Sequence, residues 1–236
     1  MLVYYKNDYS DGKGAQLDVD QPHFRYGAGL FETILYDGIE IQHLDRHLDR
    51  LNKSSAFFDY KVVSFDYDNV IKQLLLENDL LGHMARVNIC HLVEAGDACS
   101  VFISTNKYTP PSEDKVFKLC HYPEVHNSYM SRHKTMNYMH FMLAKKYANK
   151  LGCDDALLTD ELGNVLETSM AAVVFHDGKQ YLAPKSYNKL NSIAFEIFAE
   201  EHDVSLVDVC VNDLHRYRIL LMNSLMGVRK AIFQES

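Results

Sequence analysis

Lys134 has the side chain whose chemistry is easiest to name, because it stands before a stretch that reads as a helix to about Lys150. A lysine amine that forms a Schiff base must lack its proton for part of the time, and burial or nearby cations favour this. Arg132 and His133 precede the lysine, and Met and Tyr residues follow it. The sequence therefore permits a nucleophilic amine at position 134, although an ordinary surface lysine fits the same spacing.

Glu167 is a carboxylate that would complement such an amine. It follows the predicted turn at Gly163-Asn164. A carboxylate beside a pyridine nitrogen keeps that nitrogen protonated, so that a pyridine cofactor can withdraw electrons from a substrate carbon. The alternative is a glutamate exposed at the edge of a strand, and the residue types alone do not choose between the two.

Three basic side chains lie along one flank of the helix predicted over residues 43–57, namely His43, His47 and Arg50. A guanidinium in this place suits phosphate oxygens, and an ion pair at the surface is the alternative. For the two histidines, packing against their neighbours is the favoured interpretation. No third ligand accompanies them at a familiar spacing, so we predict no metal site.

Composition excludes several classes of function. The chain has 236 residues, 47% of them hydrophobic and 24% charged, which is typical of soluble proteins with one large domain or two small ones. The formal net charge of −8 argues against a nucleic-acid partner, and no apolar run approaches the roughly 20 residues of a membrane-spanning helix. The five cysteines are scattered and odd in number, which favours free thiols in a reducing cytoplasm.

Hydrophobic periodicity predicts both strands and helices in the first half of the chain. Residues 29–36 and 39–42 are expected to form a hairpin around Asp37-Gly38, because Asp-Gly suits a two-residue type I′ turn. The other elements expected there are helices over 43–57 and 66–80, the latter capped by Ser64, and strands over 84–94 and 99–104.

The second half has the same mixed pattern. The helix after Lys134 should bury Met136, Met139, Leu143 and Tyr147. Two prolines and a lack of periodicity mark residues 106–114 as a linker. We therefore predict two mixed α/β domains (an α+β chain overall), residues 1–105 and 115–236, with Lys134 and Glu167 in the second. The remaining expected elements are a helix over 191–200 and strands over 115–120, 155–159, 171–176, 180–183, 204–211, 218–224 and 227–233.

Three segments, taken together, resemble the class IV aminotransferase family, the fold-type-IV pyridoxal-phosphate (PLP) enzymes. They are Tyr26-Gly-Ala-Gly-Leu-Phe-Glu-Thr-Ile34 with His47-Leu-Asp-Arg-Leu51, Lys134-Thr-Met-Asn-Tyr138 leading to Asp155-Ala-Leu-Leu-Thr-Asp-Glu-Leu-Gly-Asn-Val-Leu-Glu167, and Leu221-Met-Asn-Ser-Leu-Met-Gly227. The resemblance implies a two-domain fold like that of D-amino-acid aminotransferase, with pyridoxal 5'-phosphate between the domains. It also implies a homodimer with each site near the subunit interface.

The resemblance implies a role for each matching residue. Lys134 becomes the Schiff-base lysine and general acid/base, Glu167 the partner of the pyridine nitrogen, and Arg50 a phosphate ligand. The turn Leu190-Asn-Ser-Ile-Ala194 matches the phosphate loop, so the cofactor-binding set also includes Ser192, Ile193, Ala194 and Ser224. A helix N-cap and a buried strand serine remain the alternatives for these positions.

Departures from the family pattern affect the substrate side. Ala28 and Ala172 replace common polar residues, the phosphate loop lacks its usual Gly and Arg, and the strand ending Cys90-His-Leu-Val93 lacks an Arg-Gly pair. Arg25, Arg86 and His91 could each bind a substrate carboxylate, with an ordinary surface charge as the favoured alternative for any one of them, and Phe31 is a further substrate candidate.

The Lys-Thr-Met-Asn entry and Asn223-Ser-Leu-Met226 look most like the aminodeoxychorismate lyases of folate biosynthesis. These enzymes eliminate pyruvate and give 4-aminobenzoate. The alternatives are a branched-chain or D-amino-acid aminotransferase acting on a small amine or amino acid, or a catalytically silent member with a binding or structural role.

Overall fold

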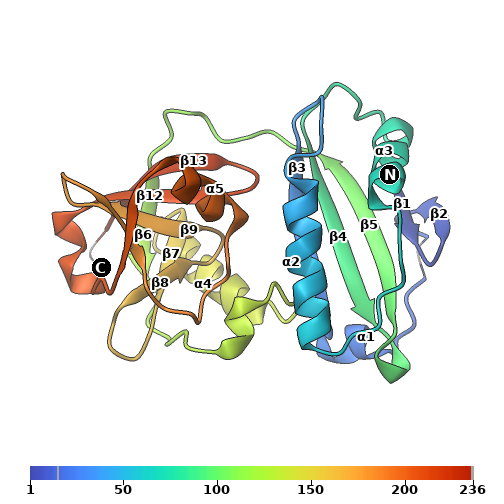
Figure 1. The fold of residues 1–236 in the computed structure, drawn as a ribbon, viewed down its shortest axis with the longest axis horizontal. Coiled ribbons are helices and arrows are strands. Elements are labelled where there is room, and N and C mark those ends of the chain that lie inside the picture. Colours follow the sequence, from blue (N-terminus) through green and yellow to red (C-terminus); the bar gives the residue numbers. More distant parts are fainter. Residues whose placement is uncertain (15, 235–236) are drawn as a thin grey trace. The chain divides into compact units, whose positions relative to one another are not determined.

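The computed structural model describes residues 1–14 and 16–234, and the chain divides into two compact units (Figure 1). Unit 1 comprises Met1–Pro110 with Lys134–Asn137, and unit 2 comprises Pro111–His133 with Tyr138–Ser236. The sequence placed Lys134 in the C-terminal domain, and this assignment is wrong. The lysine returns to unit 1 because its backbone pairs with a strand there.

Unit 1 is built on a five-stranded antiparallel sheet with the order β2-β1-β5-β4-β3. Helices α2 and α3 pack against its strands. Its strands are β1 (Leu2–Tyr5), β2 (Asp8–Asp11), β3 (Gly29–Tyr36), β4 (Ala85–Val93) and β5 (Cys99–Lys107). Its helices are α1 (Pro22–Tyr26), α2 (Leu44–Phe57), α3 (Tyr67–Glu77) and the 3₁₀ turn η1 (Ala95–Asp97).

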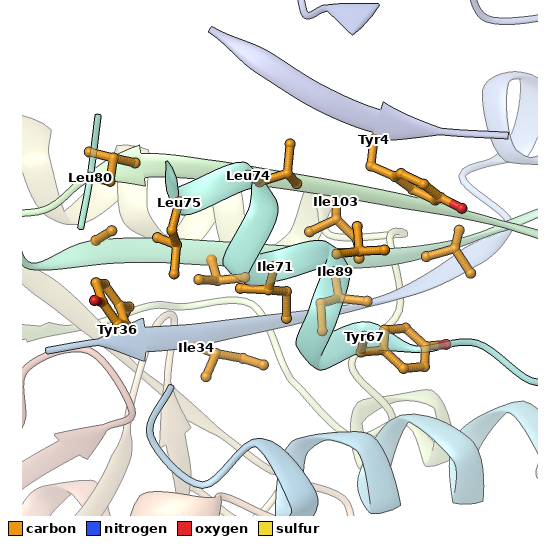
Figure 2. Packing of buried hydrophobic residues seen from close by; sticks show 14 of the residues in the cluster. Tyr4, Ile34, Tyr36, Tyr67, Ile71, Leu74, Leu75, Leu80, Ile89 and Ile103 are labelled. Atoms are coloured by element: carbon orange, nitrogen blue, oxygen red, sulfur yellow. The ribbon is translucent and has the colours of Figure 1, made fainter. Parts of the chain in front are cut away.

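The core of unit 1 follows from alternation along its strands. In β3 every second residue from Leu30 to Tyr36 is buried, as expected of a strand with one face toward a core. Ile34, Ile71 and Leu74 are fully buried and pack together in the cluster of Figure 2. Each such side chain contributes about 1.5–3 kcal/mol by leaving water. The Asp66 carboxylate accepts from the Asn69 N–H at 3.1 Å, so Asp66 caps α3, not Ser64.

The hairpin predicted around Asp37-Gly38 forms only as a short one: the Gln42 N–H donates to the Leu35 oxygen at 2.8 Å and the Asp37 N–H to the Glu40 oxygen at 3.2 Å, but residues 39–42 form no strand. Asp37 Oδ1 accepts the backbone N–H groups of Ile39 and Glu40 at 2.8 and 2.9 Å, which folds the segment into a compact loop. An isolated bridge between Tyr36 and Ile41 joins this loop to the end of β3. The long partner of β3 is β4, which pairs with it along its whole length.

Unit 2 is built on an eight-stranded mixed sheet with the order β11-β10-β9-β12-β13-β6-β7-β8. Three neighbouring pairs are parallel: β10 with β11, β13 with β6, and β6 with β7. The strands are β6 (Phe117–His121), β7 (Asp155–Thr159), β8 (Val165–Thr168), β9 (Ala172–His176), β10 (Tyr181–Pro184), β11 (Val204–Val207), β12 (Arg218–Asn223) and β13 (Gly227–Phe233). The helices are η2 (Tyr129–Arg132), α4 (Met139–Lys150), α5 (Ile193–Glu201) and η3 (Val211–Arg216).

Helix α4 buries a different face from the one predicted. Ala144 and Ala148 are its fully buried residues, and they pack in a cluster with Ala156 of β7. Met139 and Leu143 are exposed, with relative accessibilities of 62% and 46%. Small alanines let the helix approach the sheet closely, so Met139 and Leu143 are displaced from the contact, whereas Tyr147 is partly buried and packs against the cluster. Within the described residues, no helix is both long and apolar enough to cross a membrane.

Candidate cofactor site

Lys134 is fixed on the edge of β3 in unit 1. Its carbonyl oxygen accepts the Phe31 N–H at 2.9 Å, and the Met136 N–H donates to the Gly29 oxygen at 2.9 Å. Thr135 forms an antiparallel bridge with Leu30 between these bonds. The segment is therefore extended, and helix α4 begins only at Met139. The Lys134 Nζ lies 4.4 Å from the centroid of the Phe31 ring.

Glycines make room for this segment. A Cβ atom at Gly29 would lie 2.6 Å from the His91 carbonyl oxygen and 2.7 Å from Met136 Sδ, closer than side chains approach. Gly27 ends α1 with a φ of 65°, in the left-handed region that favours glycine, and its open side faces the backbone of Met136 and Asn137. The Gly-x-Gly sequence thus provides the surface that receives the lysine segment.

Arg50 is held by a buried carboxylate in unit 1. Its Nε donates to Glu32 Oε1 at 2.8 Å and its Nη2 to Glu32 Oε2 at 2.6 Å, while His47 Nδ1 lies 2.7 Å from the same Oε2. Burial raises the pKa of Glu32, but the hydrogen bonds and charges of His47 and Arg50 outweigh it and lower that pKa to about 2. The carboxylate therefore stays ionised and fixes the plane of the guanidinium.

The two histidines beside Arg50 have different environments. His47 is buried, and its Nε2 has no hydrogen-bond partner among the described residues. His43 is exposed and sits before α2 with a φ of 53°. Across residues 1–14 and 16–234, no three His, Cys, Asp or Glu side chains come together as a metal site.

Glu167 lies on β8 of unit 2 and is buried, so the alternative of an exposed strand-edge glutamate is wrong. Its Oε1 accepts the Leu190 N–H at 3.3 Å and lies 3.2 Å from His126 Nε2. Its Oε2 accepts no hydrogen bond from any residue that the structure describes. One oxygen is thus fixed by the protein, and the other keeps its capacity to accept a proton donor.

The N-terminus of α5 has the features of an anion site in unit 2. Ser192 caps the helix, and its Oγ accepts the Phe195 N–H at 3.3 Å. Ile193 and Ala194 are the first residues of the helix, where backbone N–H groups lack a partner within the helix. The N-cap alternative for Ser192 is thus confirmed, and this role is compatible with anion binding by the amides that follow.

Ser224 begins the turn between β12 and β13 and is not part of a strand. Asn223 Oδ1 shapes this turn by accepting the N–H groups of Leu225 and Met226 at 3.0 and 2.9 Å. The alternative of a buried strand serine is therefore wrong, since Ser224 is half-buried in a turn.

His91 was predicted to bind a substrate carboxylate, and this prediction is wrong. The residue is fully buried in unit 1. The Ser55 hydroxyl donates to the Leu51 oxygen at 2.9 Å, so His91 Nδ1 donates to Ser55 Oγ at 3.1 Å and Nε2 accepts from the Tyr67 hydroxyl at 2.7 Å. Burial lowers the pKa of His91 to about 4, against the raising effect of Glu32, so the ring is neutral at pH 7.

The other substrate candidates stay predictions. Arg25 on α1 and Arg86 on β4 are exposed. Phe31 and Arg86 lie on the sheet face away from the core, because each stands between two buried residues of its strand and successive side chains point to opposite faces.

Comparison with known proteins decides the family. The model of the amino-transferase class IV family matches residues 29–231. This chain belongs to the class IV aminotransferase family. The resemblance noted in the sequence is thus confirmed, and the chain is a member of a family of enzymes.

Individual relatives of this chain carry different activities in their names. A Methanocaldococcus jannaschii protein named "Putative branched-chain-amino-acid aminotransferase" is 28% identical over 91% of this chain and 81% of its own length. The aminodeoxychorismate lyase of Bacillus subtilis is 30% identical over 50% of this chain and 39% of its own. A solved branched-chain amino acid aminotransferase from T.th., complexed with N-(5'-phosphopyridoxyl)-L-glutamate, superposes with a TM-score of 0.87 at 19% identity, covering 98% of this chain and 85% of that one.

Three residues near the candidate site residues were not singled out from the sequence. Glu32 had a detectable signal, because it alternates with Leu30 and Ile34 and so falls on the buried face of a strand, where a charge needs a partner. His126 and Lys189 had no such signal. They lie in irregular segments whose path only the folded chain defines.

Proposed function

We propose that this chain binds pyridoxal 5'-phosphate and that Lys134 carries it. Membership in the class IV aminotransferase family supports the proposal, as does the phosphopyridoxyl group bound by the solved aminotransferase described above. The observation that carries it is the state of Glu167, a buried carboxylate with one oxygen held by the protein and the other without a hydrogen bond among the described residues. A protonated pyridine nitrogen is the donor that such an oxygen suits.

The proposed ligands fit a phosphorylated pyridine in charge and chemistry. Arg50 offers a guanidinium whose orientation is fixed by Glu32, and guanidinium groups recognise phosphate oxygens. The amides of Ile193 and Ala194 at the start of α5 suit an anion, and the Ser224 hydroxyl is a further donor. When bound, the cofactor supplies an electrophilic carbon for the substrate amine and a ring that accepts electrons.

The activity that we propose is 4-amino-4-deoxychorismate lyase. The Lys134 amine removes the ring proton from the substrate carbon that bears nitrogen, and the bond between the neighbouring ring carbon and the enolpyruvyl oxygen breaks. The enolpyruvate that leaves takes up one proton and becomes pyruvate. The products are pyruvate and 4-aminobenzoate, and the gain of an aromatic ring supplies much of the driving force. The hydrogen bond from the Phe31 N–H to the Lys134 carbonyl oxygen fixes the backbone of the lysine and gives its side chain a constant starting point for this transfer.

A branched-chain or D-amino-acid aminotransferase is the second candidate. It is favoured by the M. jannaschii relative, whose match extends over 91% of this chain, whereas the lyase match covers 50%. In that reaction Lys134 would remove the same kind of proton and return it at a different carbon. A catalytically silent member would bind no PLP at all.

The two activities differ in their products. The purified chain with PLP is expected to release 4-aminobenzoate and pyruvate in equal amounts from 4-amino-4-deoxychorismate. Keto-acid exchange on L- and D-amino acids should be at least about tenfold slower in kcat/KM, which corresponds to about 1.4 kcal/mol in transition-state binding. Rapid transamination without 4-aminobenzoate would reject the lyase in favour of the aminotransferase.

We further propose that the chain is a cytoplasmic homodimer. The family resemblance supports the dimer, and the free state of all five cysteines supports a reducing compartment. Sedimentation of the purified chain at micromolar concentration tests the dimer, and a single species with a mass near 27.2 kDa would contradict it.

A further inference from the structure

Lys189 is a half-buried cation that the reaction proposed above does not use. Its Nζ lies 5.5 Å from the centroid of the Phe195 ring. With the residues that the structure describes, it forms no hydrogen bond and no ion pair within 4.0 Å. Burial lowers the pKa of Lys189, and the charge of Glu167 opposes this shift. The ammonium is therefore partly desolvated, and Glu167 is the charge that stabilises it.

The two charges share one small cavity of unit 2, with a volume of about 10 Å³. A cavity of this size has room for about one water molecule, so little solvent screens the attraction between the ammonium and the carboxylate. Glu167 and Lys189 are the only charged side chains of its lining. The other lining residues are Leu166, Ala172, Val173, Ala183, Pro184, Leu190, Ser192 and Phe195.

Other polar and titratable groups lie on the segments around Glu167 and Lys189. His126 and the Leu190 N–H both meet Oε1, and the His126 ring stacks on His140 of α4 at 5.0 Å. Burial and the neighbouring His126 lower the pKa of His140, with Glu124 opposing. On α5 the acidic residue of the first turn, Glu196, accepts a hydrogen bond from the Asn191 amide. Strands β9 and β10 contribute no charge to the cavity.

Resting on the role proposed for Glu167, we propose that Lys189 is a positioning residue whose charge, in the same cavity as Glu167, limits the proton affinity of the cofactor's ring nitrogen. A positive charge beside the Glu167 carboxylate and this nitrogen repels the proton that the two groups share, so this proton leaves at a lower pH than it would beside an apolar side chain. Lys189 thereby sets the alkaline limit of the pH range in which the ring withdraws electrons from the substrate.

The test compares three variants of the full chain loaded with PLP that is ¹⁵N-labelled at the ring nitrogen. In Lys189→Met, the pH at which the ring nitrogen loses its proton should rise by about one unit, and the alkaline limb of kcat should move with it. Lys189→Arg keeps the charge and should restore the original pH. Lys185→Met removes an exposed lysine four positions earlier and is the matched control, which should titrate like the unchanged chain.

Two results would overturn the proposal. One is an unchanged ring-nitrogen titration in Lys189→Met. The other is a large loss of PLP affinity in this variant without a change in that titration, which would make Lys189 a phosphate ligand instead.

A second readout needs no cofactor. In the chain without PLP, the Lys189 amine, observed by ¹³C NMR of labelled lysine, should lose its proton at a lower pH in Glu167→Gln than in the unchanged chain. An identical titration in both would overturn the charge pair. A chain that takes up no PLP would contradict the proposed function and the ring-nitrogen role, while this titration still decides whether Lys189 and Glu167 interact.

Discussion

Two buried glutamates differ in how many of their oxygens the protein uses. Glu32 binds Arg50 through both oxygens and His47 through one of them, whereas Glu167 is bound through Oε1. A carboxylate with both oxygens satisfied is a structural anchor, and one with a remaining lone-pair site can receive a ligand. This difference, more than residue type, separates the supporting role of Glu32 from the cofactor role proposed for Glu167.

Glu32→Gln tests the anchor. The substitution leaves Arg50 and His47 without a buried negative charge, so the free energy of unfolding at pH 7 should fall by about 3 kcal/mol. Urea denaturation measures this. Asp49→Asn is the matched control on α2, because the exposed Asp49–Lys53 pair contributes at most about 0.5 kcal/mol. Equal losses in the two variants would contradict the anchoring role.

At the scale of helices and strands, the sequence did not reveal the polar networks that join one element to another. Alternation predicted the strands β3 and β4, yet it did not show that His91 is buried among polar partners. Its partners come from α2 and α3, dozens of positions away, and no local signal joins Ser55, Tyr67 and His91. The hairpin after β3 stays short for a local reason, because the Asp37 carboxylate accepts the N–H groups of Ile39 and Glu40 and holds the segment in a compact loop.

His91 gives unit 1 a distinct dependence on pH. Its pKa is lowered from 6.5 to about 4 in the folded chain, so the folded state resists protonation. The contribution of the neutral ring to the free energy of unfolding is complete above pH 6.5. This contribution is lost as the pH falls toward 4, by about 3 kcal/mol for a pKa shift of this size. In His91→Gln the difference in unfolding free energy between pH 7 and pH 4 should be smaller by about that amount. An unchanged difference would show that the ring is not buried in its neutral form.

Gly29→Ala tests the joint between β3 and the lysine segment. The new Cβ would meet the His91 oxygen and Met136 Sδ, so residues 134–137 must shift. This shift should lower the free energy of unfolding by about 1–3 kcal/mol. PLP affinity should fall as well, because Lys134 moves with it. Gly14→Ala is the control, since its Cβ would make only an ordinary contact at 3.5 Å. Wild-type PLP affinity in Gly29→Ala, measured by fluorescence titration, would contradict the link.

For the molecule as a whole, the order of the motifs along the chain predicted the family better than the chemistry of any single residue did. The family could be identified from the sequence because the matching segments recur in the family's order, and the roles of Lys134 and Glu167 that follow from it stay predictions. The main boundary between the two units, after Pro110, falls inside the linker predicted over residues 106–114, but the return of residues 134–137 to unit 1 could not be predicted, since it depends on backbone bonds to β3 that composition does not reveal. The buried face of α4 was missed for a similar reason, because the sheet beneath it selects alanines over the longer methionines.

The central claim is that Lys134 bonds covalently to PLP. Treating the purified chain with PLP and borohydride, then digesting it, should yield a modified peptide that contains Lys134, identified by mass spectrometry. Lys134→Ala should show no modification and no yellow colour, while Lys145→Ala, which changes a lysine of the following helix, should be labelled at Lys134 as before. Labelling of another lysine in the unchanged chain, or undiminished labelling in Lys134→Ala, would contradict the account.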